Sequence, residues 1–152
     1  LKKVILIGPD EEAFSRVEPE FKEKVEFLSR ERLLEMEETE VSAFVKNQVG
    51  EYPLYISIDK DVLCETDADT NWSQGDMRLS TMLECLGAVK EKCAERISRI
   101  LGVDICGECD VTEPGNSALN DMANAALLEF FTSTDVGEDI EENKNGTTGG
   151  NG

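Results

Sequence analysis

Short apolar runs alternate along the chain with segments whose apolar positions recur at helical spacing. The apolar runs, rich in β-branched residues, predict strands over residues 3–7, 25–28, 54–58 and 100–106. The helical spacing predicts helices over residues 10–17, 29–36, 39–50, 79–96 and 114–130, with Thr39 and Gly50 as the expected caps of the third. Apolar strands that alternate with helices are typical of a parallel sheet covered on both faces. The pattern therefore predicts an α/β fold, a three-layer αβα arrangement with a mainly parallel sheet.

A change of composition near residue 135 divides the chain. Residues 135–152 are rich in acids, Asn, Gly and Thr, a composition that cannot bury enough apolar surface to fold. The expected organisation is one α/β domain over residues 1–134 and a disordered tail over 135–152. The first strand starts almost at Leu1, without a methionine or a lead-in, so we expect the chain to begin inside a larger protein and to lack its amino-terminal half.

The charge balance narrows the possible partners. With 33 acidic and 15 basic residues the formal net charge is -18, which opposes binding to nucleic acid or to an anionic membrane and favours small cationic partners. No apolar run reaches the length of a membrane span, and no signal-peptide pattern is present, so a cytoplasmic protein is expected. The five cysteines are odd in number and suit reduced thiols, and the chain contains no histidine.

Two carboxylates follow the central apolar run at its carboxyl end. Asp59 and Asp61 are separated by one residue, and side chains at i and i+2 of an extended backbone project from the same side. Ligands of open α/β sheets collect beyond the carboxyl ends of the strands, where such a pair can converge on one divalent cation. The simpler alternative is that both are solvated acids at a strand end. Lys60, between them, points to the opposite side and is expected to be structural.

A further acid, Glu108, follows the strand over residues 100–106. Adjacent parallel strands end on the same side of a sheet, so Glu108 is expected to face the crevice that holds Asp59 and Asp61. Its two oxygens could there accept parallel hydrogen bonds from a planar guanidinium or amidinium group. The alternative is an exposed loop acid. The polar loop between Cys64 and Met77 follows the carboxylates directly and is the expected place for other substrate-contacting groups.

Three segments together resemble the carboxyl-terminal half of the arginase/agmatinase (ureohydrolase) family, over roughly residues 1 to 132. They are Ser57-Ile58-Asp59-Lys60-Asp61, the loop sequence Asn71-Trp72-Ser73-Gln74-Gly75, and Gly102-Val103-Asp104-Ile105 running into Gly107-Glu108. The resemblance implies that Asp59 and Asp61 are catalytic and bind a cluster of two manganese ions. It also implies that Glu108, and Asn71 in the loop, bind the substrate. A homo-oligomer is a possible assembly.

The implied reaction is hydrolysis of a C–N bond in a small cationic guanidinium or amidine-like substrate, by a metal-bound hydroxide. The family takes its histidine ligands from motifs earlier in the chain, which here would lie in the missing amino-terminal half. Val62-Leu63-Cys64 replaces the family's usual Asp-Pro after the acidic pair, which indicates a divergent arginase-like subgroup. The 152-residue chain alone is therefore expected to bind metal weakly and to be inactive as an enzyme.

Two other classes of function remain open. Cys106-Gly107-Glu108-Cys109 is a C-x-x-C sequence, as in thiol–disulfide redox proteins, but the surrounding acids disfavour the thiolate that such chemistry requires. The second alternative is a non-catalytic acidic module that binds a basic protein partner, which only the net charge suggests.

Overall fold

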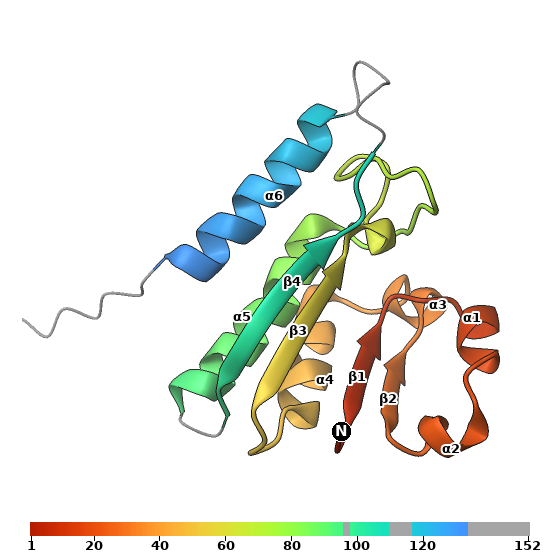
Figure 1. Ribbon diagram of the computed structural model, residues 1–152, viewed down its shortest axis with the longest axis vertical. Helices are drawn as coiled ribbons and strands as arrows, with labels where there is room; N and C mark the ends of the chain where they lie inside the picture. Colours follow the sequence, from red (N-terminus) through yellow and green to blue (C-terminus); the bar gives the residue numbers. More distant parts are fainter. Residues whose placement is uncertain (96–97, 110–116, 134–152) are drawn as a thin grey trace, which may run out of the picture.

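The structure, a computed structural model, describes residues 1–95, 98–109 and 117–133 and has the expected α/β fold (Figure 1). The strands are β1 (Val4–Ile7), β2 (Val25–Leu28), β3 (Leu54–Asp59) and β4 (Ile100–Cys106). The helices are α1 (Glu11–Ser15), α2 (Pro19–Lys22), α3 (Arg30–Leu33), α4 (Glu38–Gln48), α5 (Leu79–Ala94) and α6 (Ser117–Thr132), with a 3₁₀ turn η1 (Lys60–Val62) after β3. The expected start of the last helix at Pro114 and the tail over 135–152 lie outside the described residues.

The strands form two parallel pairs. β1 pairs with β2 from Val4↔Val25 to Ile7↔Leu28. β3 pairs with β4 from Leu54↔Ile100 to Asp59↔Cys106. In Figure 1, β1 lies beside β3, although no ladder joins the two pairs within the described part of the chain. The parallel direction expected from the sequence is confirmed, and it brings the carboxyl ends of β3 and β4 together.

Three helices bury the apolar face of the strands. Leu28 of β2 packs with residues of α4, its C-cap and α5, namely Val41, Val45, Val49, Cys85 and Ala88. Ile58 of β3 packs with residues of the following loop, α5 and α6, namely Leu63, Ala68, Met77, Met82, Leu86, Ala123 and Leu127. On the opposite side of β2, Phe14 of α1 stacks on Phe27 with ring centroids 4.1 Å apart. None of the helices in the described residues has both the length and the apolar character that a membrane span requires.

The outward face of β3 and β4 is exposed and polar at its carboxyl end. Tyr55 is 65% exposed and lies over Gly102, where an added Cβ would be 3.0 Å from the tyrosine ring. Further along the strands, Ser57 donates a hydrogen bond of 2.7 Å to Asp104 Oδ1. Asp59, the last residue of β3, is exposed on the same face. Alternation along β3 thus separates an apolar inner face from the face that carries the first acid of the pair.

The expected caps of α4 are wrong. The helix begins after Glu37, whose backbone N–H donates a hydrogen bond of 2.9 Å to the Glu40 carboxylate, and Thr39 lies inside the first turn. This reciprocal arrangement satisfies donors at the helix start that a threonine cap would otherwise serve. At the other end Val49 leaves the helix in extended backbone, and Gly50 does not take the left-handed conformation of a glycine cap.

The two faces of α6 allow a direct test of this packing. Leu127 of α6 is fully buried in the core cluster that contains Ile58 of β3, whereas its neighbour Leu128 is 63% exposed. Replacing Leu127 by Ala should lower the free energy of unfolding by about 2–5 kcal/mol, because a cavity remains in the core. Leu128→Ala, the matched control, should change it by less than about 0.5 kcal/mol. Urea denaturation followed by circular dichroism measures both, and equal effects would contradict the placement of α6.

Candidate functional site

The ends of β3 and β4 meet at a glycine. Gly107 follows β4 with φ of +81°, a conformation that glycine adopts without strain. A Cβ at this position would lie 2.8 Å from Asp59 Oδ1, 2.8 Å from the backbone nitrogen of Lys60 and 3.0 Å from that of Asp61. The backbone after β4 therefore rests directly against the acidic turn that follows β3, as the parallel register requires.

The two acids are held together by a turn. Asp59 ends β3 in extended backbone, but Asp61 lies in the 3₁₀ turn η1. Asp59 Oδ1 accepts a hydrogen bond of 3.1 Å from the backbone N–H of Asp61. The expectation that both acids continue one extended strand is wrong for Asp61, because a local side-chain-to-backbone bond competes with the strand conformation. The acids remain at the carboxyl end of β3, as expected.

Asp61 carries the most unusual polar atom of the site. Its Oδ2 accepts a long hydrogen bond of 3.4 Å from Ser73 Oγ. Its Oδ1 is buried, and no hydrogen-bond partner for it is present among the described residues. A buried acceptor without a partner costs about 1–3 kcal/mol, and more when it is charged. A cation beside this oxygen would remove that cost, and hard carboxylate oxygens suit manganese, magnesium or calcium.

The donor set of the pair is incomplete. No group of three or more His, Cys, Asp or Glu side chains with metal-binding geometry exists among the described residues. Asp59 and Asp61 could supply two ligands of a divalent cation at most, and a cluster of two ions needs ligands beyond those that these ranges supply.

Lys60 lies between the two acids and is fully buried. Its ammonium group forms an ion pair with Glu108 Oε1 and donates a hydrogen bond of 2.8 Å to Asn124 Oδ1 of α6. Asn124 Nδ2 in turn donates to the same Glu108 oxygen at 3.0 Å. These three side chains, which we call the Lys60 cluster, join the turn after β3 and the loop after β4 to the middle of α6. The structural role expected for Lys60 agrees with this burial.

Glu108 therefore has one oxygen engaged before any substrate is considered. Partial burial raises the pKa of Glu108, but the hydrogen bonds from Lys60 and Asn124 and the lysine charge outweigh this effect and hold the pKa below its ordinary value. The side chain is 56% exposed. Oε1 already accepts two hydrogen bonds, so a guanidinium could bind both oxygens only by displacing one of those bonds, and Oε2 remains for another donor. The substrate-binding role of Glu108 stays a prediction.

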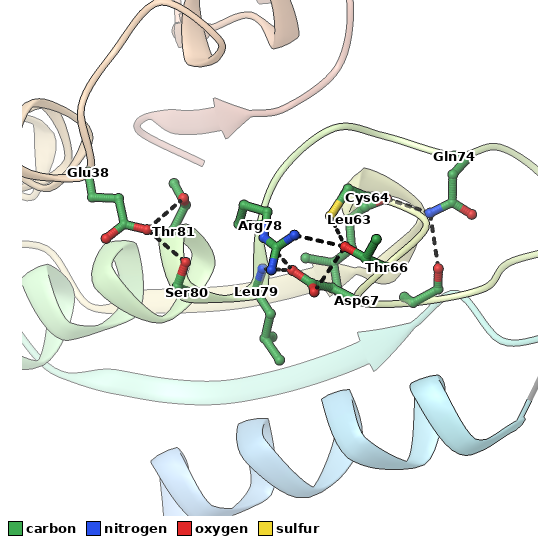
Figure 2. A network of polar contacts seen from close by, with 11 residues as sticks. Glu38, Leu63, Cys64, Thr66, Asp67, Gln74, Arg78, Leu79, Ser80 and Thr81 are labelled. Carbon is green, nitrogen blue, oxygen red and sulfur yellow. Dashed lines mark hydrogen bonds and ion pairs between the residues drawn. The ribbon is translucent and has the colours of Figure 1, made fainter.

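Asn71 is exposed in the loop between η1 and α5, two residues before Ser73. Several side chains of this loop form hydrogen bonds that stabilise the loop, as Figure 2 shows. Gln74 Nε2 donates to the carbonyls of Leu63 and Ala68 at 2.6 and 3.2 Å. Asp67 accepts a hydrogen bond of 2.7 Å from the first amide of α5 at Leu79. Asn71 itself is thus presented on an ordered loop beside the acidic turn, and its substrate-binding role stays a prediction.

Two asparagines of α6 were missed by the sequence analysis. Asn120 is 1% exposed and exchanges two hydrogen bonds with the backbone of Asp69, of 2.9 and 2.6 Å. Asn124, one turn later, belongs to the Lys60 cluster. Both interrupt the apolar stripe of the helix at i, i+4 spacing, and this was the signal available in the sequence, because a polar residue on a buried face needs a partner.

The C-x-x-C pair is poorly suited to redox chemistry. Cys106 and Cys109 are both free thiols. Loss of hydration raises the pKa of the Cys106 thiol, and the carboxylates of Asp59 and Asp104 raise it further. A thiol with a raised pKa forms little thiolate near neutral pH, so it is a weak nucleophile.

Comparison with known proteins gives a limited result. No family model matches the chain. The chain is similar to an uncharacterized protein of Thermotoga maritima, with 35% identity over 85 residues. This match covers 55% of the chain and 32% of that protein, so the chain spans about a third of the length of the relative.

The close contact at Gly107 predicts that a side chain at this position lowers the stability of the protein. Gly107→Ala should lower the free energy of unfolding by about 1–3 kcal/mol, because the residue has positive φ and a methyl group would collide with Asp59 and the Lys60 backbone. Gly50→Ala is the matched control, since an added Cβ there meets nothing within 4 Å and φ is not positive. Thermal unfolding of both variants measures the difference, and equal stability would show that the strand ends do not meet as described.

The carboxylates near Cys106 should slow the alkylation of its thiol. The thiol should react with iodoacetamide with a midpoint above the ordinary cysteine pKa of about 8.5, because less thiolate is present at any lower pH. Asp59→Asn should lower that midpoint by removing a neighbouring negative charge. Peptide mass spectrometry of timed reactions between pH 7 and 10 measures the rate at Cys106. A midpoint at or below about 8.5 in the unmodified chain would contradict this electrostatic environment.

Proposed function

We propose that this chain carries part of the active site of a metal-dependent hydrolase of the ureohydrolase type. The observation that carries the proposal is the acidic turn at the carboxyl end of β3, in which Asp61 Oδ1 is buried without a partner among the described residues. The position beyond the strand ends of a parallel α/β sheet is the usual place of such sites. The resemblance of the Asp59–Asp61 segment and of Glu108 to the arginase/agmatinase family supports the same interpretation.

In this proposal Asp59 and Asp61 hold a divalent cation, manganese in the first place. When bound, the cation would supply a water of lowered pKa as the nucleophile and neutralise developing charge. Water adds to the planar carbon of a guanidinium or amidine, and a C–N bond breaks with departure of a protonated amine. The chain's own acids then have two tasks, which are to hold the cation and to keep a cationic substrate in place.

Substrate binding would use the exposed acids around the turn. Glu108 Oε2 is the free carboxylate oxygen of the Lys60 cluster, and it can accept one hydrogen bond from a substrate N–H. Asn71 on the neighbouring loop is a second candidate. The net charge of -18 would raise the local concentration of small cations without fixing their orientation.

The proposed site needs ligands that the described residues do not contain. We propose that they come from polypeptide outside this sequence, with the amino-terminal half of a longer, cytoplasmic protein as their source. Assembly into a homo-oligomer belongs to the same proposal. In this view the chain alone binds metal weakly and releases no urea, because two carboxylates hold a divalent ion loosely.

Calorimetry with Mn²⁺ tests the cation site on the chain as it is. Weak binding is expected, with affinity reduced more than about tenfold in Asp59→Asn and in Asp61→Asn, since loss of an outer-shell partner alone commonly costs 10–100-fold. Asp121→Asn, an exposed change on α6, is the control and should bind Mn²⁺ as the unmodified chain does. Equal Mn²⁺ binding in all four proteins would reject the site. Urea release from guanidino compounds by the 152-residue chain would contradict the need for further ligands.

A further inference from the structure

Lys60 occupies a position that the proposed chemistry leaves unused. It stands between two acids that would hold a cation, yet its side chain is 0% exposed and extends into the interior. There it meets Glu108 from the end of β4 and Asn124 from α6. A buried ammonium group held by two acceptors has one orientation, because any other would leave its charge unpaired in a poorly hydrated interior.

That orientation also fixes the turn. The backbone of η1 is short, and the carbonyl of Lys60 itself accepts a hydrogen bond of 2.9 Å from the N–H of Leu63, which is fully buried. Rotation of the turn about the strand axis would move Lys60 out of the cluster and Leu63 out of the core. With both of these anchored inward, the backbone at Asp59 and Asp61 is held in one conformation, in which Asp59 is exposed and Asp61 Oδ1 is buried.

We propose that Lys60 and Asn124 are positioning residues for the cation site: the Lys60 cluster sets the orientation of Asp59 and Asp61 and thereby the affinity for a divalent cation. This inference rests on the proposed function, because it assigns the task of the two acids to cation binding. Asn124 acts from α6, so the helix takes part in the site without touching the cation.

The effect of the Lys60 cluster on the orientation of the acids can be separated experimentally from the effect of its charge on cation affinity. Removing Lys60 alone would leave Glu108 as an extra negative charge and would itself attract cations. Two charge-matched changes avoid this effect. Asn124→Leu keeps every charge and removes one acceptor and one donor of the cluster. The double change Lys60→Met with Glu108→Gln replaces the ion pair by two neutral side chains of similar length.

Matched controls are available on the surface. Lys46 and Glu91 form an exposed ion pair of 2.6 Å between α4 and α5, so Lys46→Met with Glu91→Gln repeats the double change away from the site. Asn47, exposed on α4, gives the control Asn47→Leu. Neither control variant changes a residue of the acidic turn.

Two measurements are made on each variant. Electron paramagnetic resonance of free Mn²⁺ gives the dissociation constant, which should rise about 10–100-fold in both cluster variants. Amide hydrogen exchange at Leu63, divided by the rate at Val45 in α4 to remove global unfolding, should rise at least about tenfold in the same variants. The surface controls should change neither quantity.

The outcomes are distinguishable. An unmodified chain that binds no Mn²⁺ would overturn the proposed function and this inference with it. An unmodified chain that binds Mn²⁺ at Asp59 and Asp61, with the same affinity in both cluster variants, would overturn the inference alone. Faster exchange at Leu63 with unchanged Mn²⁺ affinity would make the cluster purely structural and would overturn it too. If the double variant does not fold, Asn124→Leu decides the result.

Discussion

The ammonium group of Lys60 is the constraint on which the arrangement of the site depends. A charge that leaves water needs an opposite charge and enough hydrogen-bond acceptors beside it, because its desolvation costs several kcal/mol. Glu108 provides one of these acceptors from the loop after β4, and Asn124 provides another from α6. The turn after β3, the loop after β4 and the middle of α6 are therefore fixed relative to one another by one side chain.

The acids around Lys60 differ in how their charges are compensated. Glu108 compensates a buried charge through one oxygen and keeps the other exposed. Asp61 has a buried oxygen without such compensation among the described residues, which is why we propose that it binds a cation. Asp59 stabilises the turn by accepting the Asp61 amide and also raises the pKa of Cys106. Carboxylates that favour cations thus work against thiolate chemistry at the same strand end.

Apolar and polar side chains lie on opposite faces of β3. Ile58 and Leu63 bury the inner side against α5 and α6, while Tyr55, Ser57 and Asp59 line the exposed side. The asparagines of α6 cross this division, since they reach from the core helix to the loops beside the acidic turn. A helix that looks like simple core packing therefore also positions the candidate site.

The sequence by itself determined the α/β fold, the parallel direction of the strands and the position of Asp59 at a strand end, because these follow from local apolar patterns. It also indicated that Lys60 turns away from the acids. Only the tertiary structure decided that Asp61 lies in a 3₁₀ turn, that Glu108 is paired, and that Asn124 completes the pair. The physical reason is distance along the chain: residues 60, 108 and 124 meet only after two strands and a helix have packed, and no local pattern records which buried charge finds which partner.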